Sequence, residues 1–482
     1  MRGADLPGLK LTDLANLEFE PAVMRAMAEE VVARAVDHIA TLGDQPACGD
    51  VRAEALARSL REPVPEHPAD LRSLLDPLFD EWIPRSFNAP GPGYLAYIPG
   101  GGLYPAALAD FIADTTNRYT GVWQAAPVLL QLEANALDWL RDWMQFPATT
   151  RGLFTTGGSM ANFNAIVCAR ERYLGTDIRR GVMYTSTQAH HSIAKSAKLA
   201  GIFSDRVRSV EVDGDFRMRV DALEAAIARD RRDALTPFLV VASAGTTNTG
   251  AVDPLDAVAD VCTRERMWHH VDGAYGAFFY AVPALRPLMP GLSRADSLTL
   301  DPHKGMFLPY GTGALLVRDG KALRAAQDVP HAGYLPDMPD DEFYDPSLHG
   351  PDLSRGFPGL RVWLTVKLFG AEKFRAAIAE KRELALDAAR RIARIPGIAM
   401  DAEPQLSLFA FHVTRQGAGL AEENAATRRL IGDVTARGRV MLTGCTVDDR
   451  FLARVCVLSF RTRQAQIDAC VEDVAGAAIW RP

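Results

Sequence analysis

The first hydrophobic pattern along the chain is an apolar stripe at helical spacing over residues 21–42. Its members are Met24, Met27, Val31, Ala35 and Ile39. Residues spaced in this way lie on one face of a helix, and Pro21 and Gly43 suit its first turn and its end. Because this helix precedes the main body of the chain, a partner subunit could cover its apolar face.

Short apolar runs alternate with helical patterns between residues 107 and 317. One helix carries leucines at positions 129, 132, 137 and 140, and another follows Ser159. The expected strands are 181–185, 238–242, 267–271, 297–300 and 314–317. Such alternation predicts an α/β domain with a largely parallel sheet. The preceding residues 87–106 are rich in Pro and Gly and predict an irregular loop.

The C-terminal third predicts a smaller α+β unit. Residues 332–356 are polar and turn-rich, and long loops of this kind are usually functional or disordered. The elements expected beyond them are helices at 372–395, 421–437 and 464–478 and strands at 406–413, 440–442 and 453–460. We therefore expect an N-terminal helical segment (1–86), a large α/β domain (87–370) and a small α+β domain (371–482).

Composition and charge narrow the class of protein. Hydrophobic residues make up 48% of the 482 residues and charged residues 23%, the balance of a soluble globular chain. The net charge of −7 argues against a nucleic-acid surface. We find no apolar run near the ~18 residues that span a bilayer, and no signal peptide. The six cysteines form no C-x-x-C pair, so we expect reduced thiols, a cytoplasmic protein and no metal site.

A Gly-Gly-Ser sequence before a helical run is the first candidate for chemistry. Gly157, Gly158 and Ser159 would leave free backbone N–H groups at a helix start, where a phosphate can bind. Taken alone, such a sequence is more often a plain loop and helix cap. The segment contains neither G-x-G-x-x-G nor G-x-x-x-x-G-K-[ST], which argues against dinucleotide and NTP sites.

Two pairs of adjacent histidines follow or interrupt the expected strands. His190 and His191 come after the strand at 181–185, near the edge of the sheet where α/β proteins bind ligands. Neighbouring histidines point in different directions, so either one alone is more typical of a surface or a helix cap. His269 and His270 lie within the strand at 267–271, and we interpret them as packing residues.

A carboxylate and a lysine also stand at strand ends. Asp272 ends the strand at 267–271 and is followed by small residues, so it could pair with a cation or simply cap a helix. Lys304 lies just beyond the strand at 297–300, between His303 and Gly305. A desolvated lysine beside a pocket can lose its proton and attack an aldehyde. Most single lysines only solvate a surface.

These segments, in this order, resemble the group II amino-acid decarboxylases that depend on pyridoxal 5′-phosphate (PLP) and include the aromatic-L-amino-acid decarboxylases. The similarity spans about residues 19–463. It implies an aspartate-aminotransferase-like α/β fold (fold type I) in which Lys304 carries PLP as a Schiff base, Asp272 keeps the pyridine nitrogen protonated and His190 stacks on the ring. The remaining cofactor contacts that it implies are Gly157, Gly158, Ser159, Thr247, Ala274 and His303.

The resemblance extends to the substrate side. The residues that it assigns to an apolar or aromatic-lined substrate pocket are Tyr97, Ile98, Pro99 and Trp123. Aromatic decarboxylases usually have a hydroxyl residue after this proline, where the present chain has Gly100. No basic residue stands ready there to bind a side-chain carboxylate, which argues against a glutamate-like substrate.

The residue that returns a proton to Cα is a tyrosine on a mobile loop in this family. Alignment on residues 353–355 puts Pro346 at that position, with Tyr344 two residues earlier. We predict Tyr344 as the proton donor, with Tyr334 as the next candidate. Related enzymes that lack the tyrosine let the carbanion meet O₂ and release an aldehyde in place of an amine.

The predicted function is decarboxylation of an aromatic or hydrophobic L-amino acid by a homodimer with its active site at the interface. An aldehyde-forming oxidative decarboxylase or another PLP lyase is the nearest alternative. A non-catalytic PLP-fold scaffold and a nucleotide-dependent dehydrogenase are further alternatives, and the second of these lacks its glycine fingerprint.

Overall fold

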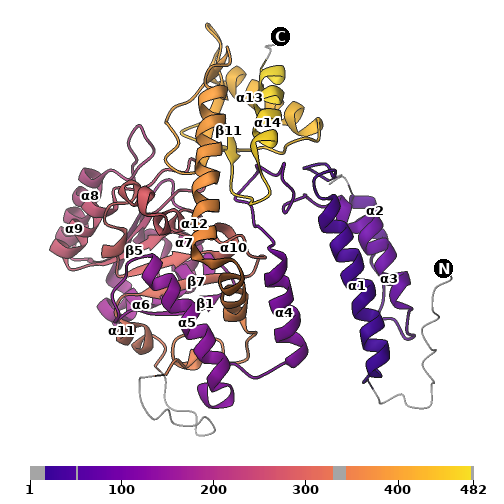
Figure 1. Cartoon of the computed structure of the whole chain (residues 1–482). Helices are drawn as coiled ribbons and strands as arrows, with labels where there is room; N and C mark the ends of the chain where they lie inside the picture. Colours follow the sequence, from indigo (N-terminus) through magenta and orange to yellow (C-terminus); the bar gives the residue numbers. More distant parts are fainter. Residues whose placement is uncertain (1–16, 50–52, 329–342, 479–482) are drawn as a thin grey trace.

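The computed structural model describes residues 17–49, 53–328 and 343–478 (Figure 1). Its helices are α1 Pro21–Thr41, α2 Glu54–Ser59, α3 Leu71–Pro77, α4 Tyr104–Thr116, α5 Pro127–Trp143, α6 Gly158–Leu174, α7 Ser192–Leu199, α8 Val220–Arg232, α9 Leu255–Glu265, α10 Pro302–Gly305, α11 Gly320–Ala325, α12 Pro358–Ile392, α13 Leu420–Ala436 and α14 Gln464–Ala477. Its strands are β1 Arg151–Thr155, β2 Gly181–Ser186, β3 Val207–Val210, β4 Thr236–Ser243, β5 Trp268–Asp272, β6 Ser297–Leu300, β7 Gly313–Val317, β8 Ile398–Ala399, β9 Leu408–Val413, β10 Thr443–Val447 and β11 Arg450–Cys456.

A seven-stranded sheet forms the centre of the large α/β unit, in the order β1-β7-β6-β5-β4-β2-β3. The pairs from β3 to β6 are all parallel, whereas β7 runs antiparallel to both β6 and β1. This confirms the predicted α/β class with a largely parallel sheet. The parallel strands bring their carboxyl ends to one edge, where ligands bind in such folds.

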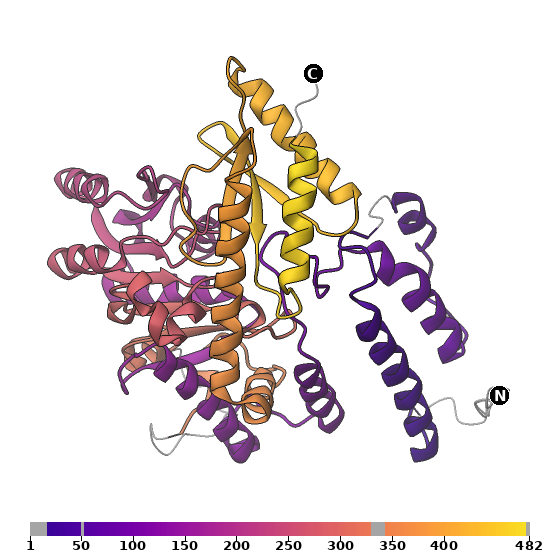
Figure 2. The same cartoon turned by 45° about the horizontal axis from the view of Figure 1, so that its top comes forward.

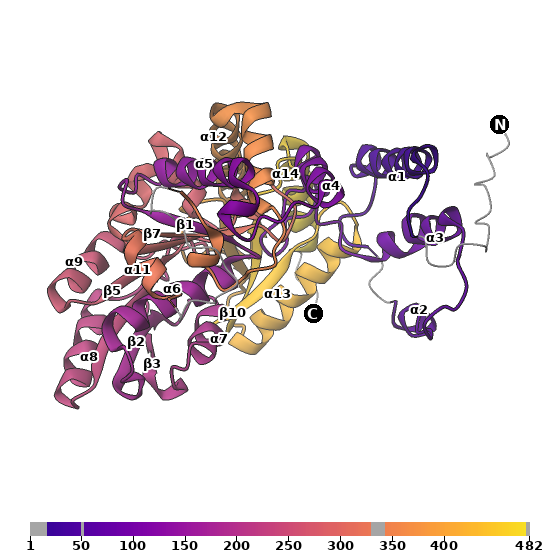
Figure 3. The ribbon, with the colours of Figure 1, turned by 90° about the horizontal axis from the view of Figure 1, so that it is seen from below.

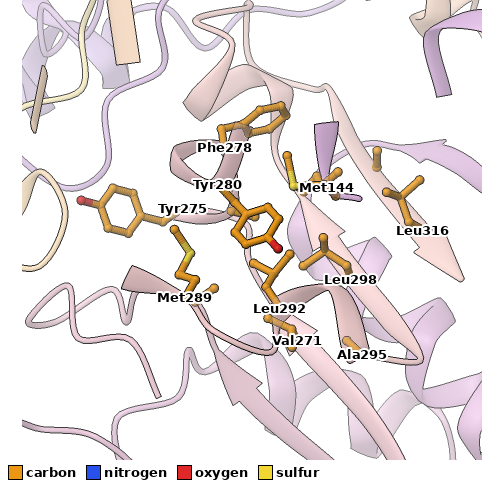
Figure 4. Packing of buried hydrophobic residues seen from close by; sticks show 14 of the residues in the cluster. Met144, Val271, Tyr275, Phe278, Tyr280, Met289, Leu292, Ala295, Leu298 and Leu316 are labelled. Carbon is orange, nitrogen blue, oxygen red and sulfur yellow. The ribbon is translucent and has the colours of Figure 1, made fainter. Parts of the chain in front are cut away.

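Apolar side chains leave the central strands toward both faces of the sheet. Val240 and Leu316 belong to one buried cluster, and their neighbours Val241 and Leu315 belong to another on the opposite face. Alternation of this kind requires helices on both faces, which α5, α8 and α9 supply on the first face and α6, α7 and α11 on the second. Figure 4 shows part of the first cluster, where Val271 and Leu298 from neighbouring strands meet Leu292.

The C-terminal unit is a four-stranded antiparallel sheet in the order β10-β11-β9-β8, covered by α13 and α14. Helix α12 joins it to the large unit and stands as a long element through both (Figures 1 and 2). Gly370 interrupts α12 with φ 74° and ψ 152°, a conformation that glycine adopts without strain. The domain boundary expected after residue 370 stays a prediction.

Helices α1, α2 and α3 stand to one side of the rest of the chain (Figures 1 and 3). An ion pair between Arg34 and Asp76 ties α1 to α3 at 2.5 Å. No residue of α1 is buried, and Met24, Val31 and Val36 of its surface are 40–45% exposed. An apolar helix surface of this kind is typical of a helix that packs against a partner.

Several predicted boundaries in the chain were wrong. Strands β1 and β3 were missed because neither is a continuous apolar run: β1 begins with Arg151 and Gly152, and β3 contains Arg208 and Ser209. Residues 440–442 form no strand but a single bridge from Met441 to Tyr94, and the strand lies at β10. All six cysteines are free. Within the described ranges, no helix is long and apolar enough to cross a membrane.

Candidate active site

A cavity of about 370 Å³ lies at the carboxyl edge of the central sheet, between the start of α6 and the end of β5. Most of the predicted cofactor residues meet there. The lining residues are Thr156, Gly157, Gly158, Ser159, Met160, Asn162, His190, Ser192, Ser243, Gly245, Thr246, Thr247, Asp272, Ala274, Tyr275, Asp301, His303 and Lys304. Four sequence segments up to 147 residues apart therefore form one site, since they hold Gly157, His190, Asp272 and Lys304.

The first turn of α6 forms one end of the cavity. Gly157 precedes the helix with φ 155°, and Gly158 is its first residue. A Cβ atom at Gly158 would lie 3.0 Å from the Cβ of Ala274 and 3.2 Å from Oδ2 of Asp301. The glycines therefore leave the backbone bare where the unpaired N–H groups of a helix start can meet a phosphate. His303 flanks this end, with its Nδ1 2.8 Å from the carbonyl oxygen of Thr312.

Asp272 stands at the opposite side, at the end of β5. Each of its carboxylate oxygens accepts one hydrogen bond: Oδ2 from the side-chain amide of Asn162 at 3.0 Å and Oδ1 from the backbone N–H of Ala274 at 3.2 Å. The side chain is buried, so these two donors fix the plane of the carboxylate. Its remaining lone pairs are available to a protonated ring nitrogen.

His190 follows β2 and lines the same cavity. Its Nδ1 lies 2.8 Å from the hydroxyl of Ser192, whose backbone N–H also donates to it at 3.3 Å. Burial lowers the pKa of His190 below its usual value, although the Asp272 carboxylate acts in the opposite direction. His190 is therefore neutral at pH 7. His191 is exposed and stands at the N-cap of α7, as the surface or cap interpretation predicted.

Lys304 lies in the short helix α10 with its Nζ 2.8 Å from Oδ2 of Asp301. Burial acts to lower the pKa of this lysine, but the Asp301 carboxylate outweighs it and raises the pKa above the ordinary value. The other oxygen of Asp301, Oδ1, is buried with no hydrogen-bond partner among the described residues. The lysine is therefore held as an ammonium until something separates it from Asp301.

The turn at residues 245–250 forms a further wall. Gly245 has φ 97°, and the hydroxyl of Thr246 is engaged within the turn by Thr249 at 3.0 Å and by the N–H of Ala251 at 3.2 Å. Arg454 from β11 donates to the carbonyl oxygens of Thr247 and Asn248. The small C-terminal sheet therefore holds the turn that presents Thr247 to the cavity.

A comparison with known protein families shows which kind of protein has this cavity. Residues 54–414 match the family model described as the pyridoxal-dependent decarboxylase conserved domain. The chain belongs to this family. It is a PLP-dependent amino-acid decarboxylase, a carboxy-lyase of fold type I.

Curated relatives of this decarboxylase include the aromatic-L-amino-acid decarboxylase of Bacillus atrophaeus, which is 33% identical over 93% of the chain and 94% of the relative. The L-2,4-diaminobutyrate decarboxylase of Rhizobium meliloti is 30% identical over 83% and 81%. Among solved structures, Oryza sativa TDC with PLP and tryptamine superposes with a TM-score of 0.90 at 25% identity, covering 96% of this chain and 99% of that one.

The residues of the decarboxylase cavity fit PLP. The bare first turn of α6 suits the phosphate, the amine of Lys304 suits the aldehyde, and the oriented carboxylate of Asp272 suits the pyridine nitrogen. When bound, PLP supplies an electron sink for the bond that breaks at Cα. Within the described part of the chain, no three His, Cys, Asp or Glu side chains are grouped to hold a metal ion.

The structure does not bring the predicted substrate residues of this decarboxylase into the cavity of one chain. Tyr97 is 52% exposed, and the backbone N–H of the neighbouring Gly100 donates to the hydroxyl of Tyr310 at 3.1 Å. Trp123 stacks on Phe343 with ring centroids 4.4 Å apart. Ile98 is buried, and Pro99 lies beside it in the same loop. The substrate pocket predicted from these residues stays a prediction.

Tyr344 lies elsewhere in the decarboxylase. It is buried against α5 and lines a separate cavity of about 300 Å³ with residues such as Arg141 and Arg151. Burial and, to a smaller extent, the Glu133 carboxylate raise the pKa of Tyr344 above its usual value. Its role as proton donor is untested, and Tyr334 lies outside the described residues.

The lining residues that sequence reasoning missed include Asn162, Ser192 and Asp301, and it also missed Arg454, which holds the turn at residues 245–250. Asn162 sits one helical turn beyond Gly158, and helical spacing places such residues on the same face. Asp301 precedes the Pro-His-Lys sequence directly and could have been noticed. Arg454 acts from the small domain, so no local pattern reveals it. His270, interpreted as a packing residue, hydrogen-bonds through both ring nitrogens.

Proposed function

We propose that this decarboxylase acts on an aromatic or other hydrophobic L-amino acid and releases CO₂ and the corresponding amine. The cavity that places Lys304, Asp272 and His190 together carries the proposal. The aromatic-L-amino-acid decarboxylases among its relatives support the substrate class. Among the described residues that line the cavity, Lys304 is the one Lys or Arg, so this lining offers no second cation to an acidic side chain, which also supports the substrate class.

In this proposal each residue has one physical task. Lys304 would hold the cofactor covalently through its side-chain amine. Asp272 keeps the pyridine nitrogen protonated through a charge-assisted hydrogen bond, an interaction of about 1.5–3 kcal/mol. His190 stacks on the ring, and Gly157, Gly158, Ser159, Thr247, Ala274 and His303 hold the phosphate and the ring in place. Alignment of the scissile bond with the ring is the result.

We propose that the working enzyme is a cytoplasmic homodimer whose substrate pocket is completed across the interface. The exposed apolar surface of α1 and the 52% exposed Tyr97 support this arrangement, since both leave apolar area to be covered. The pocket residues Tyr97, Ile98, Pro99 and Trp123 would then face the cavity of one subunit or the other. Light scattering should give twice the mass of one chain, and a monomeric active enzyme would contradict the arrangement.

We also propose Tyr344 as the residue that returns a proton to Cα. Its burial in a second cavity requires the segment after residue 342 to rearrange first. Tyr344→Phe should then shift the product from amine toward aldehyde. Equal amine yields from the variant and the wild type would assign the proton to another group.

An aldehyde-forming reaction is the second candidate function. The observation that favours it is the placement of the Tyr344 hydroxyl outside the cofactor cavity. The fold alone is compatible with it, since Rhodiola rosea 4-hydroxyphenylacetaldehyde synthase superposes with a TM-score of 0.88 at 22% identity, over 95% of this chain and 98% of that one.

One experiment separates the two candidates. The purified enzyme is incubated with PLP and a panel of aromatic, aliphatic and acidic L-amino acids, and amine, aldehyde, ammonia and peroxide are measured together. Amine without peroxide from aromatic substrates is the expected result. Aldehyde, ammonia and peroxide in equal amounts would favour the second candidate.

A further inference from the structure

Asn162 lies at the centre of a buried hydrogen-bond network behind the cofactor cavity. Its side-chain amide N–H₂ donates to Oδ2 of Asp272 at 3.0 Å and to the hydroxyl of Ser192 at 3.2 Å. Its side-chain oxygen accepts from the hydroxyl of Thr299 at 2.7 Å and lies 2.9 Å from Nε2 of His270. Asn162 is 1% exposed. Both hydrogens of its amide nitrogen and both lone pairs of its amide oxygen therefore have partners inside the protein.

The network continues away from the cavity to an indole. His270 Nδ1 lies 2.8 Å from the hydroxyl of Ser297, and that hydroxyl accepts from Nε1–H of Trp268 at 2.8 Å. An indole nitrogen is only a donor. The Ser297 hydroxyl therefore accepts from Trp268 and keeps its own proton. Because Asp272 is only an acceptor, the Asn162 oxygen faces Nε2 of His270, which must donate. Nδ1 therefore accepts the Ser297 proton. Burial lowers the pKa of His270 to about 4, so this imidazole is neutral at pH 7 and carries its one proton on Nε2, directed at Asn162.

The direction of donation continues toward the cavity. The oxygen of the Asn162 amide accepts from His270, so its N–H₂ group faces Asp272 and Ser192. The Ser192 hydroxyl accepts from Asn162 and gives its own proton to Nδ1 of His190, 2.8 Å away. The two ends of the network, a donor-only indole and an acceptor-only carboxylate, require the same direction.

We propose that Asn162 is a positioning residue that orients the Asp272 carboxylate and, through Ser192, holds His190 as the neutral tautomer protonated on Nε2. The orientation of the Asn162 amide is fixed on the side away from the cavity by its contact with His270, which is hydrogen-bonded through Ser297 to Trp268. The inference rests on the proposed roles of Asp272 and His190. It explains how one buried amide orients both the carboxylate proposed for the pyridine nitrogen and the imidazole proposed for the ring face.

The chain supplies a matched control for each test variant. Asn164 lies two residues from Asn162 in α6 and is also 1% exposed, but it does not line the cavity: its amide donates to the carbonyl oxygen of Met160 and accepts from the side chain of Gln327. His269 precedes His270 in β5, and neither of its ring nitrogens has a partner among the described residues. The variants Asn162→Ala and His270→Leu can therefore be compared with Asn164→Ala and His269→Leu.

Two measurements on the whole protein test the proposal without using activity. The first is the dissociation constant of PLP, together with the pH at which the absorbance of the bound cofactor changes. We expect Asn162→Ala to weaken PLP binding about tenfold or more and to move that pH, while Asn164→Ala stays within about twofold of wild type. His270→Leu should give a smaller change in the same direction than Asn162→Ala, and His269→Leu should give none.

The second measurement is the ¹⁵N NMR spectrum of protein labelled at its 10 histidines, with the signals of residue 190 assigned by a His190→Gln variant. Wild type should show His190 protonated on Nε2 only. Asn162→Ala and Ser192→Ala remove the oriented hydroxyl donor at Nδ1 and leave the longer 3.3 Å bond from the backbone N–H of residue 192, so each should show a mixture of tautomers. Ser192→Ala removes one hydroxyl and decides the question if Asn162→Ala does not fold.

A His190 tautomer that is the same in wild type, Ser192→Ala and any folded Asn162→Ala overturns the proposal. So does a PLP affinity that Asn162→Ala and Asn164→Ala change equally. Neither result contradicts the proposed function. That function has its own test, because covalent binding of PLP by Lys304→Ala would contradict it.

Discussion

Lys304 and Asp301 form an ion pair inside the cofactor cavity, with Nζ 2.8 Å from Oδ2. Asp301 is 1% exposed, so its charge acts on the lysine with little screening by water. The same carboxylate lies next to the bare first turn of α6, where we place the phosphate. Before PLP arrives, Asp301 therefore stabilises the protonated lysine, which cannot attack an aldehyde.

Asp301→Asn should accelerate the covalent capture of PLP by the apoprotein at pH 7. The variant removes the charge that raises the pKa of Lys304 and leaves the burial that lowers it. A decrease of one in that pKa increases the neutral fraction about tenfold. The rate is measured from cofactor absorbance after mixing, from pH 6 to 9, with Asp319→Asn at the cap of α11 as a control. A capture rate in Asp301→Asn equal to or below that of the wild type would contradict the ion-pair account.

Gly100 and Tyr310 should act as a pair in substrate binding. A Cβ at residue 100 would lie 2.6 Å from Cζ of Tyr310, and the ring is 56% exposed, so Gly100→Ala should displace the ring at a cost in stability under about 1 kcal/mol. Tyr310→Phe removes the hydrogen bond to the Gly100 N–H. We expect each variant to raise KM for an aromatic substrate about fivefold, with no further increase in the double variant. Additive effects would show that the two residues act separately.

The buried pair of Glu133 and Arg355 should be essential for stability. Their side chains are 0% and 9% exposed and lie 2.6 Å apart, and Glu133 also accepts from the N–H of Gly359. Arg355→Met leaves an unpaired buried carboxylate and should lower the free energy of unfolding by about 3–5 kcal/mol. The double variant Glu133→Gln/Arg355→Met should recover part of that loss in urea unfolding. A double variant less stable than Arg355→Met would contradict this explanation.

The stability of the protein should fall as the pH drops below about 6.5, in part because of His269. Burial lowers the pKa of this histidine to about 3. Below pH 6.5, His269 is therefore protonated in the unfolded chain and stays neutral in the folded protein. Stability from this group is fully present above pH 6.5 and is lost as the pH falls toward 3, by about 1.4 kcal/mol per pH unit. Urea unfolding gives the free energy of unfolding at each pH, and His269→Leu should reduce its slope between pH 6 and 4 by about 1.4 kcal/mol per pH unit. A slope equal to that of the wild type would show that His269 is protonated in the folded protein at its ordinary pKa.

Local patterns placed Gly157, Asp272 and Lys304 at a helix start or a strand end, but each pattern was weak alone. The resemblance of the ordered set assigned their cofactor roles, which stay predictions, and the structure brings the three residues into one cavity. The apolar strand β4 and the four-residue strand β6 were also predicted, whereas β3 was not, since Arg208 and Ser209 interrupt its apolar run.

The contacts between distant segments could not be predicted in this way. The side chain of Asn162 meets Asp272 across 110 residues, and Arg454 holds a turn more than 200 residues away. Polar partners of this type depend on how elements pack, and their spacing in the chain is not periodic. The location of Tyr344 depends likewise on the packing of residues 343–350 against α5, which the loop composition does not encode.

The central claim is that Lys304 carries PLP. The protein is incubated with PLP, reduced with borohydride, digested and examined by mass spectrometry. We expect a pyridoxyl group on Lys304 in the peptide that contains Asp301 and His303, and none in a Lys304→Ala variant. A reduced wild-type protein with no pyridoxyl group on Lys304, or with the group on a different lysine, would contradict the account.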